Sequence, residues 1–156
     1  MQKVFIEKKI TLALAESCTG GLIASILTKI PGASNYFLGG IVSYTDQVKM
    51  DLLKVSKELI EEKTSVDLEV VKQMCRGVLK LFGSDYAIAV TGYVGPLGKS
   101  VGTVFGAIGS KNGIFAGVIP NLKGLEREEM QIQCANYLIL QLLSLIKCEE
   151  VPFADK

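Results

Sequence analysis

The first part of the chain alternates short apolar runs with segments of helical spacing. Residues 10–15 are apolar and predict a strand that leads into a polar, glycine-containing turn. An amphipathic helix is expected over 21–29, because apolar residues recur there at helical spacing and Pro31 ends the pattern. Residues 37–44 are again apolar and predict a second strand, kinked at its two adjacent glycines.

Three helices are expected next. Asp46 is a favourable N-cap for a short helix through about Leu53, and Ser56 is one for a second short helix. Ser65 is the expected cap of a longer helix that ends near Gly83. The apolar residues that recur along this longer helix are Val66, Val70, Met74 and Val78.

The second half changes period. Apolar runs at 86–91, 101–108 and 114–119, separated by turns rich in glycine, predict three strands. The short turn between the last two predicts an antiparallel hairpin, because a tight turn cannot join parallel strands. Residues 125–146 predict one long helix. The expected apolar face of this helix contains Ile132, Ala135, Ile139, Leu142 and Ile146.

These elements together predict an α/β fold in which helices cover a mixed sheet. No linker, repeat or low-complexity tract divides the sequence, so a single domain is expected over 1–156. A chain of this length is long enough to bury a sizeable core.

Composition excludes several kinds of function. The chain has no histidine, which excludes a Ser-His-Asp triad, a Cys-His pair and any imidazole acid or base. Its 17 basic and 16 acidic residues give a net charge of +1. This balance argues against broad electrostatic binding of nucleic acid or an anionic membrane, but it leaves room for a small phosphate site.

The four cysteines, Cys18, Cys75, Cys134 and Cys148, never approach CxxC spacing, which argues against zinc ribbons and thioredoxin chemistry. They are expected to be buried, reduced thiols in a cytoplasmic protein. The first residues carry no secretory signal pattern. Polar residues interrupt the uncharged stretch 130–146, so this stretch is expected to pack against protein rather than cross a membrane.

Residues 16–21 (Glu-Ser-Cys-Thr-Gly-Gly) lie where an apolar strand turns into a helix. Glycines allow close backbone approach to a ligand, and the first N–H groups of a helix lack intrahelical partners. Those donors can hold an oxyanion or a phosphate, with Ser17 placed ahead of them as a nucleophile. The same residues also fit an N-capping loop without chemistry, and the pattern alone leaves both interpretations open.

Lys49 is the second candidate, because it falls near the start of the helix that follows Asp46. A partly buried lysine there has a lowered pKa and can act as the general base for a serine nucleophile. Tyr44, at a strand end, is placed to hydrogen-bond the lysine or the leaving group. The alternatives are a solvated lysine and a half-buried aromatic of the sheet.

Five sequence blocks occur together, at residues 11–21, 31–34, 37–40, 43–49 and 89–104. The Ala-Glu-Ser-Cys-Thr-Gly-Gly run in the first block is the most specific of them. Taken together, and over the whole chain, these blocks resemble the CinA C-terminal domain family, whose active members are nicotinamide-nucleotide amidases.

The resemblance implies a three-layer α/β/α sandwich and a cytoplasmic, homo-oligomeric enzyme without cofactor or metal. Its expected partner is a small pyridine nucleotide: the family reaction converts nicotinamide mononucleotide to nicotinate mononucleotide and ammonia. The family's serine, tyrosine and lysine fall on Ser17, Tyr44 and Lys49. Lys49 is then expected to be the base, and Tyr44 to orient Lys49 or the substrate. The positions expected to bind substrate or its oxyanion are Thr19, Gly20, Gly21, Thr91, Gly92 and Arg127.

The chain departs from the family pattern in three places. The loop at 97–100 is shorter than in relatives, and only residues 1–9 stand for an N-terminal helix. Of an arginine-rich stretch, Arg127 remains, with Gln131 and Ile132 at the later positions. Two alternatives follow: a catalytically silent nucleotide-binding or scaffold protein on the same fold, and a Ser-Lys hydrolase of a different small amide.

Overall fold

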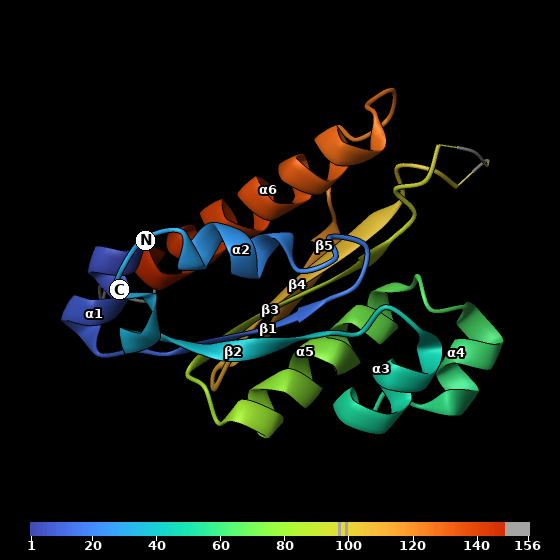
Figure 1. The fold of residues 1–156 in the computed structure, drawn as a ribbon. Coiled ribbons are helices and arrows are strands. Elements are labelled where there is room, and N and C mark those ends of the chain that lie inside the picture. The colour runs from blue at the N-terminus through green and yellow to red at the C-terminus, as the bar shows by residue number, and fades with distance from the viewer. Residues whose placement is uncertain (97, 99, 149–156) are drawn as a thin grey trace, which may run out of the picture.

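A five-stranded sheet forms the middle layer of the molecule, and helices cover both of its faces (Figure 1). The computed structural model describes residues 1–96, 98 and 100–148. Strands β1 and β2 are parallel, as are β1 and β3, whereas β4 is antiparallel to β3 and β5. The predicted three-layer α/β/α fold with a mixed sheet is therefore confirmed. In spatial order the strands are β2 (Phe37–Val42), β1 (Leu12–Glu16), β3 (Tyr86–Gly92), β4 (Val104–Ser110) and β5 (Gly113–Val118).

The central strand β1 is buried along its whole length, as its continuous apolar run predicts. Its side chains alternate between the two faces of the sheet: Leu12 and Leu14 enter one core cluster, and Ala13 and Ala15 the other. The alanine face is the one that packs against α5 (Leu68–Phe82), and such small side chains permit a close approach of the helix.

Three helices cover the leucine face: α1 (Gln2–Lys8), α2 (Leu22–Thr28) and α6 (Arg127–Cys148), with a short 3-10 turn, η1 (Ala33–Asn35). The N-terminal segment thus does contain a helix. Within the described residues, no helix is both long and apolar enough to span a bilayer.

The predicted apolar face of α6 is only partly correct. Its buried residues recur mostly every four positions: Met130, Cys134, Ala135, Leu138, Leu142 and Ile146. Ile132 is rotated by about 200° from Met130 around the helix and is 44% exposed, contrary to the prediction. Ile139 is half-buried.

The alanine face carries α3 (Asp46–Leu53), α4 (Lys57–Lys63) and α5. A Cβ atom at Gly77 would lie 2.0 Å from the carbonyl oxygen of Leu53, so only glycine lets α5 approach the end of α3 this closely. This contact fixes the short helix α3 against α5, which itself packs on the sheet.

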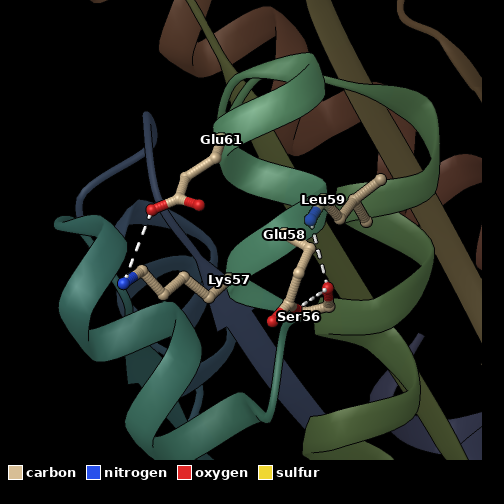
Figure 2. Close-up of polar contacts among 5 residues, drawn as sticks. All are labelled: Ser56, Lys57, Glu58, Leu59 and Glu61. Carbon is tan, nitrogen blue, oxygen red and sulfur yellow. Dashed lines mark hydrogen bonds and ion pairs between the residues drawn. The ribbon is translucent and has the colours of Figure 1, made fainter.

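The helix caps show where local sequence signals succeed and fail. Ser56 caps α4 as predicted: its hydroxyl accepts a hydrogen bond of 3.1 Å from the N–H of Leu59 (Figure 2). However, α3 is capped by Thr45 rather than Asp46, and α5 by Asp67 rather than Ser65. In both cases a second good capping residue lies within two positions of the predicted one, and tertiary packing decides between them.

The predicted hairpin is confirmed, since β4 and β5 pair antiparallel through the turn after Ser110. The strand expected to start at 101 begins only at Val104, because Gly102 has a φ of 85° and residues 100–102 form a turn. In the loop 97–100, Leu97 and Lys99 lie outside the described residues.

Candidate active site

The candidate site lies where the parallel strands β1, β2 and β3 end. Ser17 directly follows β1, and its N–H donates to the carbonyl oxygen of Val90 in β3 at 3.1 Å. Ser43 directly follows β2; its N–H and its hydroxyl both donate to the carbonyl oxygen of Glu16, at 2.7 and 3.2 Å. These bonds hold the carboxyl ends of β1, β2 and β3 side by side. Ligands of open α/β sheets typically bind at the carboxyl ends of the strands.

Lys49 reaches this junction from α3. Its ammonium nitrogen donates to the Ser17 hydroxyl at 3.1 Å and to the carbonyl oxygen of Ser43 at 2.8 Å. The residue is 2% exposed, so the alternative of a solvated lysine is wrong for this structure. Burial lowers the pKa of Lys49 from its usual value, and Asp46 and Cys18 oppose this shift. The structure therefore pairs a serine with a buried lysine whose pKa is lowered by its burial.

The thiol beside Ser17 has the opposite character. Cys18 is buried, and this burial raises the pKa of its thiol to about 12. A thiol of such high pKa stays protonated near neutral pH and is a poor nucleophile. Burial also raises the pKa of Cys75 and Cys134 to about 12. Cys148 differs from the prediction, because it is exposed.

Glu16, which the sequence analysis did not single out, organises the turn after β1. One carboxylate oxygen accepts from the Thr19 hydroxyl at 2.6 Å and from the N–H groups of Gly21 and Ile23 at 3.2 and 3.1 Å. The other accepts from the N–H of Ala24 at 2.9 Å. The side chain thus caps α2 from within the protein, at 2% exposure. The signal for this role was an acid at the end of an otherwise apolar run.

This capping corrects the expected set of anion donors. The N–H of Gly20 donates to the carbonyl oxygen of Ser17 at 3.0 Å, and the N–H of Gly21 donates to Glu16. The hydroxyl of Thr19 is bound to Glu16 as well. Thr19, Gly20 and Gly21 do not line the cleft, because all three belong to the capped turn that leads into α2, whereas Cys18 does line it. The N–H of Cys18 and that of the adjacent Thr19 donate to no other described residue, so they are the donors left for an oxyanion.

A cleft of about 330 Å³ opens over Ser17 and Lys49. Thr91 and Gly92 belong to its lining, but both are engaged in structure. The Thr91 hydroxyl donates to the carbonyl oxygen of Ser65 at 2.8 Å, and a Cβ at Gly92 would lie 2.5 Å from Val104. Their side of the cleft is thereby held in a fixed shape.

Tyr44 and Arg127 lie on the rim. The guanidinium of Arg127 donates to the Tyr44 hydroxyl at 3.0 Å, which joins the start of α6 to the segment after β2. Tyr44 is 58% exposed, and the hydrogen bonds of the Lys49 ammonium within the described part of the chain go to Ser17 and Ser43. Of the two roles expected for Tyr44, orienting Lys49 is therefore not supported, and contact with substrate stays a prediction.

Two further residues were missed. Gln131 donates from its side-chain amide to the carbonyl oxygen of Cys18 at 2.8 Å. This hydrogen bond joins α6 to the turn that carries Ser17. No local sequence pattern could predict it, because the two residues are 113 positions apart. Tyr93 also lines the cleft and gave no motif in the sequence.

Comparison with known proteins agrees with this geometry. The family model of the CinA C-terminal domain matches residues 1–146. The chain belongs to this family. CinA-like proteins of Leptospira interrogans and Geotalea uraniireducens are 49% and 51% identical to it over 116 and 117 residues. Each alignment covers 72% of this chain and 28% of the relative, so the chain spans less than a third of the length of these curated relatives.

Solved structures of the family share the fold. The competence/damage inducible protein CihA from Agrobacterium tumefaciens superposes with a TM-score of 0.88 at 33% identity, over 92% of this chain and 90% of that one. A competence-damaged protein (CinA) superfamily protein from Escherichia coli gives a TM-score of 0.85 at 32% identity, over 92% and 84%. The recognition made from sequence motifs is therefore confirmed at the level of family and fold.

Proposed function

We propose that this chain is an amidohydrolase that converts nicotinamide mononucleotide to nicotinate mononucleotide and ammonia, with Ser17 as nucleophile and Lys49 as base. The observation that carries the proposal is the 3.1 Å contact between the Lys49 nitrogen and the Ser17 hydroxyl at a buried site. In a chain without histidine, this pair supplies the proton acceptor that a serine nucleophile needs.

The neutral form of Lys49 fits its surroundings. An uncharged amine has two N–H groups and one lone pair. One N–H donates to the carbonyl oxygen of Ser43, which leaves the lone pair to accept the Ser17 proton. The N–H of Ser43 in turn donates to the backbone carbonyl oxygen of Glu16. The amine is therefore oriented by backbone groups, which keep their protons throughout the reaction.

The reaction then follows in two balanced steps. Ser17 attacks the carboxamide carbon as its proton moves to Lys49. Lys49 next gives this proton to the leaving nitrogen, the C–N bond breaks, and ammonia departs from an acyl-enzyme ester. Water attacks the ester while Lys49 accepts a proton from it. Return of that proton to the Ser17 oxygen releases the carboxylic acid product and restores the site.

The negative oxygen formed in each step needs donors. The N–H groups of Cys18 and Thr19 directly follow the nucleophile and have no acceptor among the described residues. A donor of this kind contributes about 3 kcal/mol to transition-state stabilisation. The capping of α2 by Glu16 supports this role, because it holds the turn that presents these two groups.

The substrate assignment combines the family resemblance with the size and the lining of the cleft. The cleft has a volume of about 330 Å³, which is in the range of small-molecule sites. Arg127 keeps further N–H donors besides the one bound to Tyr44, and these suit a phosphate group. We assign the phosphate to this rim and the carboxamide to the floor, at Ser17.

The test is ammonia release from nicotinamide mononucleotide by the wild type, Ser17→Ala and Lys49→Ala. We expect turnover in the wild type and its loss in both variants, with Lys57→Ala on the surface of α4 as an unaffected control. Unchanged turnover in Ser17→Ala refutes the mechanism. Absence of turnover in the wild type refutes the substrate: binding without turnover then favours a silent nucleotide-binding protein, and turnover of another carboxamide favours a hydrolase of different specificity.

A further inference from the structure

Tyr93 is an aromatic residue in the lining of the cleft that neither the mechanism nor the phosphate assignment uses. It and Tyr44 are the aromatic residues among the described lining residues. Tyr93 is 39% exposed, although it follows directly after the buried strand β3. An aromatic ring left partly open to solvent inside a cleft is available to stack on a planar ligand.

The position of Tyr93 is fixed by contacts at both ends of the residue. Its N–H donates to the carbonyl oxygen of Thr103 at 2.9 Å, and its carbonyl oxygen accepts from the N–H of Gly102 at 2.8 Å. At the far end, its hydroxyl lies 3.5 Å from the hydroxyl of Thr64. Two main-chain hydrogen bonds thus fix the backbone of Tyr93 beside the cleft, which reduces the ordering that ligand binding requires.

The charges around the cleft determine which groups could hold a positively charged ring. Among the described lining residues there is no aspartate or glutamate, and the basic ones are Lys49 and Arg127. A positively charged ring entering this site therefore finds no carboxylate to pair with. The face of an aromatic ring attracts a cation within about 6 Å without itself carrying charge.

We propose that Tyr93 is a specificity-determining residue: its ring face holds the positively charged pyridinium ring of the substrate, and so selects N-substituted pyridinium carboxamides over uncharged ones. The proposal rests on the function proposed above, since the carboxamide at Ser17 and the phosphate at Arg127 place the pyridine ring between them. Tyr93 directly follows β3, Ser17 directly follows the neighbouring strand β1, and both residues line the cleft together with Arg127.

The test compares two ligands that differ in ring charge. Binding of nicotinamide mononucleotide and of its reduced form, whose dihydropyridine ring is uncharged, is measured by calorimetry in the Ser17→Ala background, where turnover is blocked. We expect Tyr93→Leu to weaken binding of the charged ligand about 5-fold and of the uncharged one less than about 2-fold. Tyr93→Phe, which keeps the ring face, is the matched control and is expected to bind both ligands as before.

Two results overturn the proposal: equal weakening of both ligands in Tyr93→Leu, or no weakening of either. The proposed function can fail separately, if the wild type releases no ammonia from nicotinamide mononucleotide. The role of the Tyr93 ring is then tested by measuring the binding of 1-methylnicotinamide, a cation without ribose or phosphate, and of uncharged nicotinamide. Tyr93→Leu is expected to weaken binding of 1-methylnicotinamide more than binding of nicotinamide. If the wild type does not bind 1-methylnicotinamide, the proposal for Tyr93 is also overturned.

Discussion

The nitrogen of Lys49 lies 3.1 Å from the hydroxyl oxygen of Ser17, although the two residues are 32 positions apart and come from a helix and a strand end. The packing of α3 against α5 brings them together: Gly77 lets the two helices approach, and Lys49 lies on the buried side of α3. The site therefore depends on helix packing at some distance from the reacting atoms.

The pH dependence of turnover follows from the lowered pKa of Lys49. The base must be uncharged to accept the Ser17 proton, so kcat/KM is expected to rise with pH and level off above the pKa of Lys49. Because burial lowers this pKa, the midpoint falls below the usual lysine value of 10.5. A pH profile of kcat/KM checks this. A rate that falls as pH rises through this range contradicts a lysine base.

Substrate charge adds a second expectation to the same profile. A bound pyridinium ring near Lys49 is expected to disfavour the ammonium form, because two positive charges repel each other. The midpoint of kcat, which reports the enzyme–substrate complex, is therefore expected at lower pH than that of kcat/KM, which reports the free enzyme. Coincident midpoints would show that the ring does not approach the amine.

Glu16→Gln tests the internal cap of α2. The substitution puts an amide NH₂ where a carboxylate oxygen accepts backbone N–H groups, so a donor faces a donor. We expect a loss of about 1–3 kcal/mol in the free energy of unfolding. We also expect kcat to fall about 10- to 100-fold, because the turn that carries Ser17 shifts.

Chemical denaturation and steady-state kinetics measure the two effects. Glu61→Gln is the matched control, since Glu61 lies on α4 and makes only an exposed ion pair of 3.5 Å with Lys57 (Figure 2). A Glu16→Gln variant as stable and active as this control would show that the cap is dispensable.

Arg127→Ala tests the phosphate assignment. Loss of a charge-assisted contact is expected to raise KM for nicotinamide mononucleotide about 10- to 100-fold. The KM for nicotinamide riboside, which lacks the phosphate, is expected to change little. Arg76→Ala, the chain's other arginine, on α5 outside the cleft, serves as the control. Equal increases in KM for both substrates would show that Arg127 does not bind the phosphate.

Self-association is expected from the exposed apolar surface. The edge strand β5 contains no charged residue or proline, and its Phe115 and Val118 are each 58% exposed. On α6, Leu140 is 62% exposed. Light scattering is expected to show a homo-oligomer, and Phe115→Lys to shift it toward the monomer. Leu81→Lys, on α5, is the control, and a monomeric wild type would contradict the expectation.

Local patterns predicted those parts of the molecule that local physics determines. The apolar runs gave the strands, and the serine in a glycine-rich turn after β1 gave the nucleophile candidate. The burial of Lys49 was one of two open readings, because nothing near position 49 specifies that α5 covers α3. The cap at Thr45 instead of Asp46 was missed for a similar reason: adjacent residues offered equal capping chemistry.

The contacts that escaped prediction join distant segments. Glu16 was interpreted only as part of a turn, whereas its buried carboxylate accepts hydrogen bonds from N–H groups at the start of α2. Gln131 counted only as a missing arginine, yet it holds the carbonyl of Cys18. The antiparallel pairing of β3 with β4 was not predicted either, because the long connection between them carries no turn signal of defined type.

A titration of the Lys49 side chain by NMR, in protein carrying ¹³C at the lysine ε-carbons, tests the central claim most directly. The Lys49 resonance is assigned from its absence in Lys49→Met, and the exposed lysines of the same sample serve as internal references. Lys49 is expected to lose its proton at lower pH than these lysines, at the midpoint of the kcat/KM profile. A Lys49 that titrates with or above the exposed lysines would contradict it.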